Sequence, residues 1–443
     1  MSRLTSLLLL SLLCVFTISI DARGDWPGWM GAGRDNQPVG VELPDDLSKQ
    51  SPKLVWKQSA AGGYAGPAVV NGKLFITDYV TGDDVSVANF ERKSFTGEER
   101  VRCLDAESGE EIWSYRYPVK YTVSYPAGPR CTPNVDGAFV YTLGTEGDLI
   151  CFEIASGEIV WKKSLTSEYG TKAALWGYAS HPLIDGDRLI CVAGGEGSHV
   201  VAFDKKSGEE LWRQGSATEQ GYVPPTIVEA GGARQLIIGS PDQIRSLNPE
   251  TGSEYWSVPY QASNGSIIMS PLTTVVDSKT YLYMGGYSNK NLLLELSDDQ
   301  PAAEVVWRDI NRAGISPVNV QPFIDGDMIY GFDQNGTLMG VRLPSGDRLW
   351  STSEPISKRP MGSATAFIVR PKGEDRFILF TELGDLVIGT MTPEGFTEQS
   401  RAHVIEPTGV AFGRRVVWSA PAHAGSRIYM RNDKEIVCFD LKP

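Results

Sequence analysis

A short phrase recurs along the chain, and a repeat of this period constrains the fold more than any single residue does. One copy reads Cys103-Leu-Asp-Ala-Glu-Ser-Gly-Glu-Glu-Ile-Trp113, and similar copies end at Trp161, Trp212, Trp256 and Trp350. Each copy has alternating apolar residues, then a polar turn with Ser-Gly or Thr-Gly, then a second short run that ends in Trp. This pattern predicts two antiparallel strands joined by a tight turn.

Degenerate copies of the phrase complete the set. Trp307 closes a copy that has lost its Ser-Gly turn, and residues 384–395 form a copy without its Trp. The chain ends in the first half of the phrase, Ile436-Val-Cys-Phe-Asp440, while the second half, Leu54-Val-Trp56, stands near the start. This split predicts a ring that is closed by pairing of the N- and C-terminal segments.

A second marker gives an independent count of the repeats. It consists of Pro or a small residue, an apolar run, a turn and another apolar run. The marker occurs at Pro67, Pro133, Pro182, Pro225, Pro271, Pro322, Ala364 and Pro421. The two markers alternate along the chain, so each unit has about four strands in roughly 40 to 60 residues, the size of a propeller blade. We therefore predict an all-β chain, with an eight-bladed β-propeller of four-stranded antiparallel blades over residues 53–443.

These phrases resemble the Ala-x-Asp-x-x-Thr-Gly-x-x-x-Trp repeats of the PQQ-like, quinoprotein-type eight-bladed β-propellers, and the resemblance extends from Trp26 to Leu441. That family includes PQQ-dependent alcohol dehydrogenases, secreted bacterial PQQ-repeat proteins and the propeller subunit of the outer-membrane β-barrel assembly machinery. The resemblance therefore implies the fold, and it leaves open whether the chain is an enzyme or a binding scaffold.

The enzyme alternative has definite chemical requirements. A quinoprotein dehydrogenase needs carboxylate and amide ligands for Ca²⁺, an Asp as general base and an aromatic surface for the flat quinone. Trp176 could stack on a quinone and Asn319 could donate an oxygen ligand, but nothing near them in the repeats completes the set. We expect a non-catalytic scaffold without a cofactor, and a PQQ- and Ca²⁺-dependent alcohol or polyol dehydrogenase remains the alternative.

The N-terminus has the features of an export signal. Arg3, a mostly apolar stretch from Leu7 to Ile20, and Ala22 predict a cleaved signal peptide over residues 1–22. The stretch is too short to favour a membrane span. Cys14 lies inside it without a small residue directly before it, so a lipid anchor is not favoured. We expect a periplasmic or secreted protein in which residues 23–52 form a leader that packs on the propeller.

Charge and cysteine content narrow the choice of partners. The formal net charge of −13, from 41 basic and 54 acidic residues, argues against nucleic acid and against docking on anionic lipid. Cys103, Cys151 and Cys438 occupy a small apolar slot of the repeat, which indicates packed thiols. Cys131 and Cys191 are the only pair for which a disulfide is considered, and sequence does not determine connectivity.

Candidate site residues lie where the chain enters each inner strand, because these connections surround the axial channel of a propeller. We expect another protein or a small ligand to bind at this face, through a mixed aromatic and polar rim. The candidates are Tyr64, Arg130, Trp176, His181, Tyr222, Asn319, Gln321, Arg359 and Trp418. Arg130 and the Lys358-Arg359 pair could bind an anionic group in the channel. Each candidate also has a structural interpretation: the aromatic residues could pack loops, the histidine could be a buried strand-entry residue, and the arginines could pair with carboxylates.

One long insertion interrupts the first complete unit between its second and third strands. Residues 78–100 are rich in charged residues and include Phe90 and Phe95. Long loops in compact domains are usually functional or disordered. We predict a partly ordered flap over the channel mouth.

Overall fold

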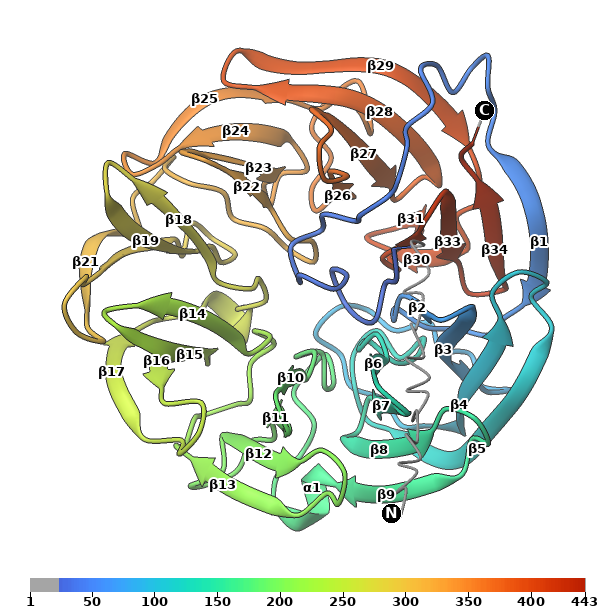
Figure 1. The fold of residues 1–443 in the computed structure, drawn as a ribbon, viewed down its shortest axis with the longest axis horizontal. Coiled ribbons are helices and arrows are strands. Elements are labelled where there is room, and N and C mark those ends of the chain that lie inside the picture. Colours follow the sequence, from blue (N-terminus) through green and yellow to red (C-terminus); the bar gives the residue numbers. More distant parts are fainter. Residues whose placement is uncertain (1–23, 443) are drawn as a thin grey trace, which may run out of the picture.

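The computed structural model describes residues 24–442 and has eight four-stranded antiparallel sheets arranged around a central axis (Figure 1). This confirms the predicted eight-bladed propeller. The predicted signal peptide, with Cys14, lies outside the described residues. Among residues 24–442, no helix has the length and apolar character needed to cross a membrane.

The first four blades follow one another along the chain, each with its innermost strand first. Blade 1 has β2 (Ala68–Val70), β3 (Lys73–Val80), β4 (Phe95–Asp105) and β5 (Glu111–Tyr121). Blade 2 has β6 (Asn134–Asp136), β7 (Phe139–Leu143), β8 (Asp148–Glu153) and β9 (Ile159–Ser164), which leads into the short helix α1 (Leu165–Glu168). Blade 3 has β10 (Leu183–Asp185), β11 (Arg188–Val192), β12 (Val200–Asp204) and β13 (Glu210–Gln214). Blade 4 has β14 (Thr226–Ala230), β15 (Ala233–Gly239), β16 (Gln243–Leu247) and β17 (Glu254–Pro259), followed by a 3-10 turn at Ser263–Gly265.

The remaining blades include both degenerate copies of the phrase. Blade 5 has β18 (Leu272–Val276), β19 (Lys279–Met284), β20 (Leu292–Leu296) and β21 (Ala303–Arg308). Blade 6 has β22 (Phe323–Asp325), β23 (Met328–Phe332), β24 (Leu338–Arg342) and β25 (Asp347–Thr352). Blade 7 has β26 (Ala366–Val369), β27 (Arg376–Thr381), β28 (Asp385–Thr392) and β29 (Gly395–His403). A two-stranded hairpin, β30 (Gly409–Ala411) and β31 (Arg414–Val416), precedes blade 8, which has β32 (Ala422–Ala424), β33 (Arg427–Arg431), β34 (Glu435–Asp440) and β1 (Lys53–Ser59).

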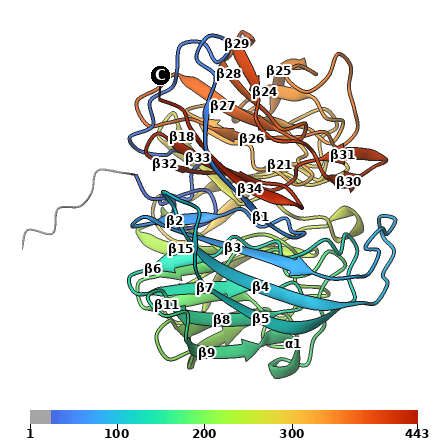
Figure 2. The same cartoon turned by 90° about the vertical axis from the view of Figure 1, so that its right-hand side faces the viewer.

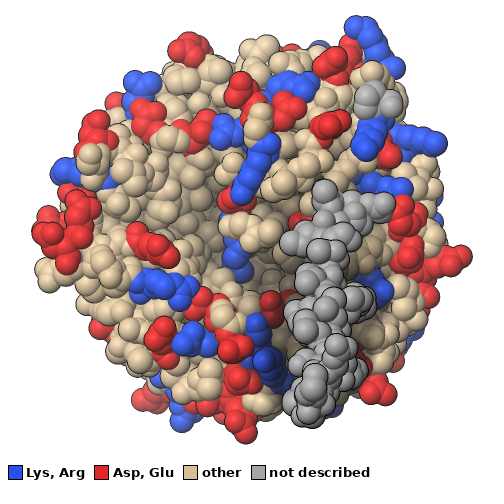
Figure 3. Space-filling view, in the orientation of Figure 1, with Lys and Arg blue, Asp and Glu red and all other residues tan. Residues whose placement is uncertain are grey.

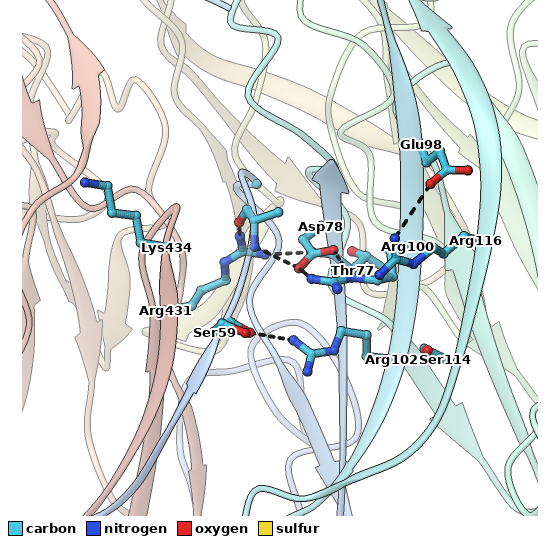
Figure 4. A network of polar contacts seen from close by, with 12 residues as sticks. Ser59, Thr77, Asp78, Glu98, Arg100, Arg102, Ser114, Arg116, Arg431 and Lys434 are labelled. Atoms are coloured by element: carbon cyan, nitrogen blue, oxygen red, sulfur yellow. Dashed lines mark hydrogen bonds and ion pairs between the residues drawn. The ribbon is translucent and has the colours of Figure 1, made fainter. Parts of the chain in front are cut away.

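Blade 8 closes the ring with strands from both ends of the chain, as predicted. The outer strand β1 pairs antiparallel with β34, so that Leu54 lies opposite Phe439 and Trp56 opposite Cys438. Buried polar contacts join blade 8 to blade 1 (Figure 4). The fully buried Arg431 donates from Nη1 to the Thr77 carbonyl oxygen at 2.7 Å. The ring is therefore closed by hydrogen bonds between blades 8 and 1 as well as by the pairing of β1 with β34, which covers the edge of β34.

The repeated phrase is explained by a contact between successive blades. The indole of Trp161 donates to the carbonyl oxygen of Lys205 in the next blade at 3.1 Å, and Trp56 donates to Ala106 at 2.9 Å. The turn glycine of the next blade lies against the same ring: a Cβ added to Gly208 would lie 2.7 Å from Trp161. Gly208 also has φ +73°, a conformation that favours glycine.

The acidic position of the phrase holds the turn in place. The Asp105 carboxylate accepts hydrogen bonds from the backbone N–H groups of Glu107 and Ser108, at 3.0 and 2.8 Å. Side chains of Asp and Asn commonly stabilise turns in this way. The phrase therefore encodes one turn and one contact with the neighbouring blade. Because blade 5 lacks the Ser-Gly turn, Trp256 of blade 4 instead donates to Oε1 of Gln235 at 2.7 Å.

The leader, residues 24–52, crosses the centre of the ring before it joins β1 (Figure 1). Trp26 and Val69 of β2 exchange two backbone hydrogen bonds of 2.7 and 2.8 Å. Further along, Arg34 donates to the Pro182 carbonyl oxygen at 2.9 Å, and the Asn36 carbonyl oxygen accepts from the N–H of Arg370 at 3.0 Å. The leader thus makes hydrogen bonds with residues at the inner strands of several blades.

The connection between β3 and β4 is shorter than predicted. β3 extends to Val80 and β4 begins at Phe95, so the flap comprises residues 81–94. Asp78 and Arg100, at the two ends of the predicted loop, instead lie opposite each other in the paired strands β3 and β4. Arg100 donates to the buried Asp78 carboxylate at 2.8 and 2.6 Å, so both charges are satisfied within the sheet. Figure 2 shows the flap and the β30–β31 hairpin projecting from the side of the propeller opposite the leader.

The cysteines of the described chain are free thiols. Cys103, Cys131, Cys151, Cys191 and Cys438 are all buried and unpaired. Cys131 and Cys191, whose connectivity the sequence does not determine, are therefore two separate thiols. Both thiols lie in one apolar cluster with Tyr178, and the Cys131 thiol donates to the Tyr178 carbonyl oxygen at 3.7 Å. They act as small packed side chains, as the other three do.

Candidate functional site

A central cavity of about 240 Å³ is lined by residues that enter the inner strands around the ring. We call it the funnel. Eight of the nine predicted site residues line it: Tyr64, Arg130, Trp176, His181, Tyr222, Asn319, Gln321 and Trp418. The ninth, Arg359, is exposed and does not line the funnel; its carbonyl oxygen accepts a hydrogen bond from the Ser357 hydroxyl. The structure therefore brings eight of the nine candidates together at the cavity and leaves Arg359 outside the group.

The funnel also contains residues that the repeat pattern did not indicate. Trp26, Trp29, Met30 and Asn36 of the leader contribute to its lining. Asn89 of the flap and Phe412 of the β30–β31 hairpin contribute from the other side of the propeller (Figure 2). The two closely spaced Trp residues were the only sequence signal that the leader contributes to the funnel lining, since the leader has no counterpart in the repeats.

Aromatic rings are grouped on two sides of the funnel. Trp176 packs against Tyr222 with ring centroids 5.3 Å apart and against Phe90 of the flap at 5.8 Å. Trp418 packs against Tyr125 at 5.8 Å and against Phe412 at 6.0 Å. These distances are typical of stabilising aromatic pairs. Each predicted Trp therefore holds a loop in place and also presents a ring to the cavity.

Arg130 has a structural role. Its five N–H donors are all used within the protein: by the carbonyl oxygens of Trp176 at 2.8 Å, Ser124 at 3.0 Å, Tyr125 at 2.6 Å and Gly128, and by the Thr145 hydroxyl at 3.3 Å. The guanidinium also lies 5.2 Å from the centroid of the Tyr64 ring. Because no N–H remains for a ligand, the geometry favours the structural interpretation of Arg130 over an anion site.

His181 is a buried, neutral residue. Its Nδ1 accepts a hydrogen bond from the N–H of Thr132 at 3.1 Å, and its ring stacks on Trp29 with centroids 4.5 Å apart. Burial, together with the nearby Arg34 cation, lowers the pKa of His181 well below its ordinary value. The ring partners of His181 are thus a backbone amide and an indole, which is the environment of a packing residue rather than of a general base.

Glu382, which the sequence did not indicate, positions Trp418. Its buried carboxylate accepts hydrogen bonds from Nε of Arg414 at 2.7 Å and from Nε1 of Trp418 at 3.1 Å. Arg414 belongs to β31, so this carboxylate links the hairpin to the Trp418 ring. A paired and hydrogen-bonded carboxylate is the form in which a buried charge is tolerated.

Two amide side chains have hydrogen-bonding capacity left over. Gln321 uses Oε1 to accept from the N–H of Ser270 at 2.8 Å, which leaves its NH₂ group as a donor. Oδ1 of Asn319 is buried and has no hydrogen-bond partner among the described residues. Buried oxygens of this kind are uncommon, because an unpaired polar group loses its hydration without compensation.

The lining does not fit a Ca²⁺-bound quinone. Among the residues that the structure describes, no Asp or Glu lines the funnel, whereas a Ca²⁺ site needs carboxylate oxygens in addition to amides. Within residues 24–442, no cluster of three or more His, Cys, Asp or Glu side chains is placed to hold a metal ion. Charged side chains of both signs are interspersed on the leader face around a central hollow, without a large patch of one sign (Figure 3).

Comparison with known families identifies the relationship. Residues 97–352, more than half of the 443-residue chain, match the PQQ-repeat family model described as "Outer membrane protein assembly factor BamB". The chain belongs to this family. Its curated relatives are distant. The BamB of Shewanella oneidensis is 22% identical over 50% of this chain and 56% of its own length, and that of Yersinia pestis is 22% identical over 71% of this chain and 74% of its own. The chain thus spans about half the length of the Shewanella protein.

Solved structures agree on the fold. The crystal structure of BamB from Moraxella catarrhalis matches with a TM-score of 0.55 at 14% identity, covering 88% of this chain and 99% of that one. Quinohemoprotein alcohol dehydrogenase from Comamonas testosteroni matches with a TM-score of 0.62 at 13% identity, covering 94% and 80%. At these identities the likeness concerns the propeller alone, and it includes an enzyme as well as an assembly factor.

Proposed function

We propose that the chain is an exported, non-catalytic propeller that acts as a protein-interaction scaffold in the cell envelope, in the assembly of outer membrane proteins. The observation that carries this proposal is membership in the family described as an outer membrane protein assembly factor. The curated relatives with that description support the same class of function.

The chemistry of the funnel supports a binding role over a catalytic one. The N–H groups of Arg130 donate to carbonyl and hydroxyl oxygens of the protein, and His181 is neutral and packed. Within the described part of the chain, no carboxylate lines the funnel. A PQQ-dependent dehydrogenase, the alternative function, requires a carboxylate base and Ca²⁺ ligands next to the quinone. The residues present do not supply that set.

The face that carries the flap and the β30–β31 hairpin is the proposed contact surface for a protein partner (Figure 2). The flap contributes the exposed apolar residue Phe90, which is 53% exposed, and the hairpin contributes Val410, 63% exposed, and Phe412, 50% exposed. Aromatic side chains are enriched in the cores of protein interfaces. We call this the flap face.

Site-specific photo-crosslinking tests the proposal. Phe412 is replaced by p-benzoylphenylalanine in cells of the native host, and Leu349 on the outer strand β25, which is 40% exposed, is the matched control. We expect position 412, and not position 349, to crosslink to a component of the outer-membrane β-barrel assembly machinery. Absence of such a product would overturn the proposal, and alcohol oxidation by the purified protein with PQQ and Ca²⁺ would establish the alternative.

A further inference from the structure

Among the described residues, the funnel offers a ligand no charged group with a free hydrogen-bonding site. No carboxylate of residues 24–442 lines it, Arg130 has no free N–H, and His181 is held in its neutral form by burial. Because the Arg130 guanidinium is already fully hydrogen-bonded, a charged molecule that left water for this cavity would lose hydration without gaining a charge-assisted hydrogen bond. The cavity therefore selects against ions and in favour of neutral ligands.

Aromatic rings dominate the walls of the funnel. The cavity is lined by Trp29, Trp176, Tyr222, Tyr125 and Trp418. Their orientation is fixed by ring packing of Trp176 on Tyr222, of Tyr125 on Trp418 and of Trp29 on His181. The volume of about 240 Å³ is slightly below that of most drug-sized ligand pockets, about 300–1,000 Å³. The occupant should therefore be a compact molecule of one or two rings with flat apolar faces.

The hydrogen-bonding groups left over in the funnel are mixed. The buried Asn319 Oδ1 needs a donor, while the Gln321 NH₂ group needs an acceptor. The Tyr222 hydroxyl accepts from the N–H of Trp176 at 3.2 Å, which leaves its own hydrogen to donate. A purely apolar ring would leave Asn319 unsatisfied, and a ligand with donors alone would leave Gln321 and Tyr222 without acceptors.

We propose that the funnel binds a neutral pyranose sugar, either free or as one unit of a glycan chain. The C–H faces of a pyranose ring stack on aromatic side chains, and its hydroxyl groups both donate and accept hydrogen bonds. This ligand fits a cavity with aromatic walls, mixed polar groups and no free charged hydrogen-bonding group. The proposal goes beyond the scaffold function, since a partner protein at the flap face and a sugar in the funnel are independent of each other.

Calorimetric titration of the purified mature protein tests the proposal. The probes are methyl β-D-glucopyranoside, N-acetyl-D-glucosamine and chitotetraose, with D-glucuronate as the charged control. We expect saturable one-to-one binding of at least one neutral probe and at least about tenfold weaker binding of glucuronate, because an unpaired buried charge is costly. Tighter binding of chitotetraose than of the single sugars would identify a glycan chain as the source, and equal binding would identify the free sugar.

Three variants test whether sugar binding depends on the polar groups of Asn319 and Tyr222. Asn319→Leu and Tyr222→Phe each remove one polar group with little change of shape and should each weaken binding roughly two- to tenfold, the range expected for one hydrogen bond. Gln261→Leu, the same kind of exchange at an exposed position outside the funnel, should leave binding unchanged. Circular dichroism checks that each variant is folded, and Tyr222→Phe carries the test if Asn319→Leu does not fold.

The outcomes separate this proposal from the scaffold function. Failure of every neutral probe to saturate the protein, or equal binding by Asn319→Leu, Tyr222→Phe and the wild type, would overturn the sugar site. Preferential binding of glucuronate would do the same. None of these results bears on crosslinking at Phe412, so the scaffold proposal stands or falls separately.

Discussion

Replacing Gly208 by Ala tests whether the repeated Gly–Trp contact holds neighbouring blades together. A Cβ at this position would lie 2.7 Å from Cδ2 of Trp161, and the backbone has φ +73°. Gly72 provides a matched control, because it has φ +72° and a Cβ there would have no atom within 4 Å. The two Ala variants share the same backbone strain, and only Gly208→Ala adds a clash between blades.

The expected magnitudes follow from these two effects. A left-handed backbone costs a non-glycine residue about 1–2 kcal/mol, so Gly72→Ala should lower the free energy of unfolding by about that amount. Overpacking of a closely packed site adds about 1–3 kcal/mol, so Gly208→Ala should lower it by about 2–5 kcal/mol in total. The difference between the two variants measures the contact with Trp161.

Urea unfolding followed by far-ultraviolet circular dichroism and Trp fluorescence gives these values. The excess effect of Gly208→Ala should largely disappear when Trp161 is replaced by Leu, because the smaller side chain leaves room for the added methyl group. Equal losses of stability for Gly208→Ala and Gly72→Ala would refute the argument. An undiminished excess in the Trp161→Leu background would refute it as well.

Two further predictions concern titratable groups of the core. Burial, together with the charges of Glu99 and Glu146, raises the pKa of Asp148 from 3.8 to about 6. The folded protein therefore binds this proton more tightly than the unfolded chain, so stability should fall as the pH rises between 3.8 and about 6. Asp148→Asn should flatten this part of the curve in urea unfolding, and an unchanged slope would contradict it. Iodoacetamide should modify Cys131 and Cys191 only after unfolding, because burial shields them and raises their thiol pKa values. Mass spectrometry counts the modified thiols, and two that stay unmodified in the unfolded, unreduced protein would indicate a disulfide.

Much of the architecture could be predicted from the sequence because the repeated phrase encodes local structure. Asp105 stabilises the turn, Gly109 adopts φ +75°, and Trp113 marks the outer strand, so each copy specifies two strands without reference to distant residues. The split copy at Trp56 and Cys438 likewise predicted their pairing across the ring closure. The periodicity did not reveal that β4 continues through charged residues, because the strand positions of these residues depend on partners elsewhere in the fold.

The candidate site was predictable only as a set of positions. Eight of the nine residues before the inner strands line the funnel, because a propeller brings these connections together at its axis. Side-chain direction within the connections is not periodic, so Arg359 could not be distinguished from Asn319 by spacing. The leader residues Trp26 and Trp29 were missed because nothing in the repeats places them in the channel.

The sequence by itself therefore determined the number of blades, the ring closure and the positions that face the axis, since these follow from short-range turn chemistry and a repeating apolar pattern. Only the tertiary structure decided what the polar groups at those positions do. It assigned all five donors of Arg130 to the protein, kept His181 neutral and left Asn319 Oδ1 unpaired. Hydrogen-bond partners and burial come from segments far apart in the chain, and a local pattern contains no information about which of these segments meet.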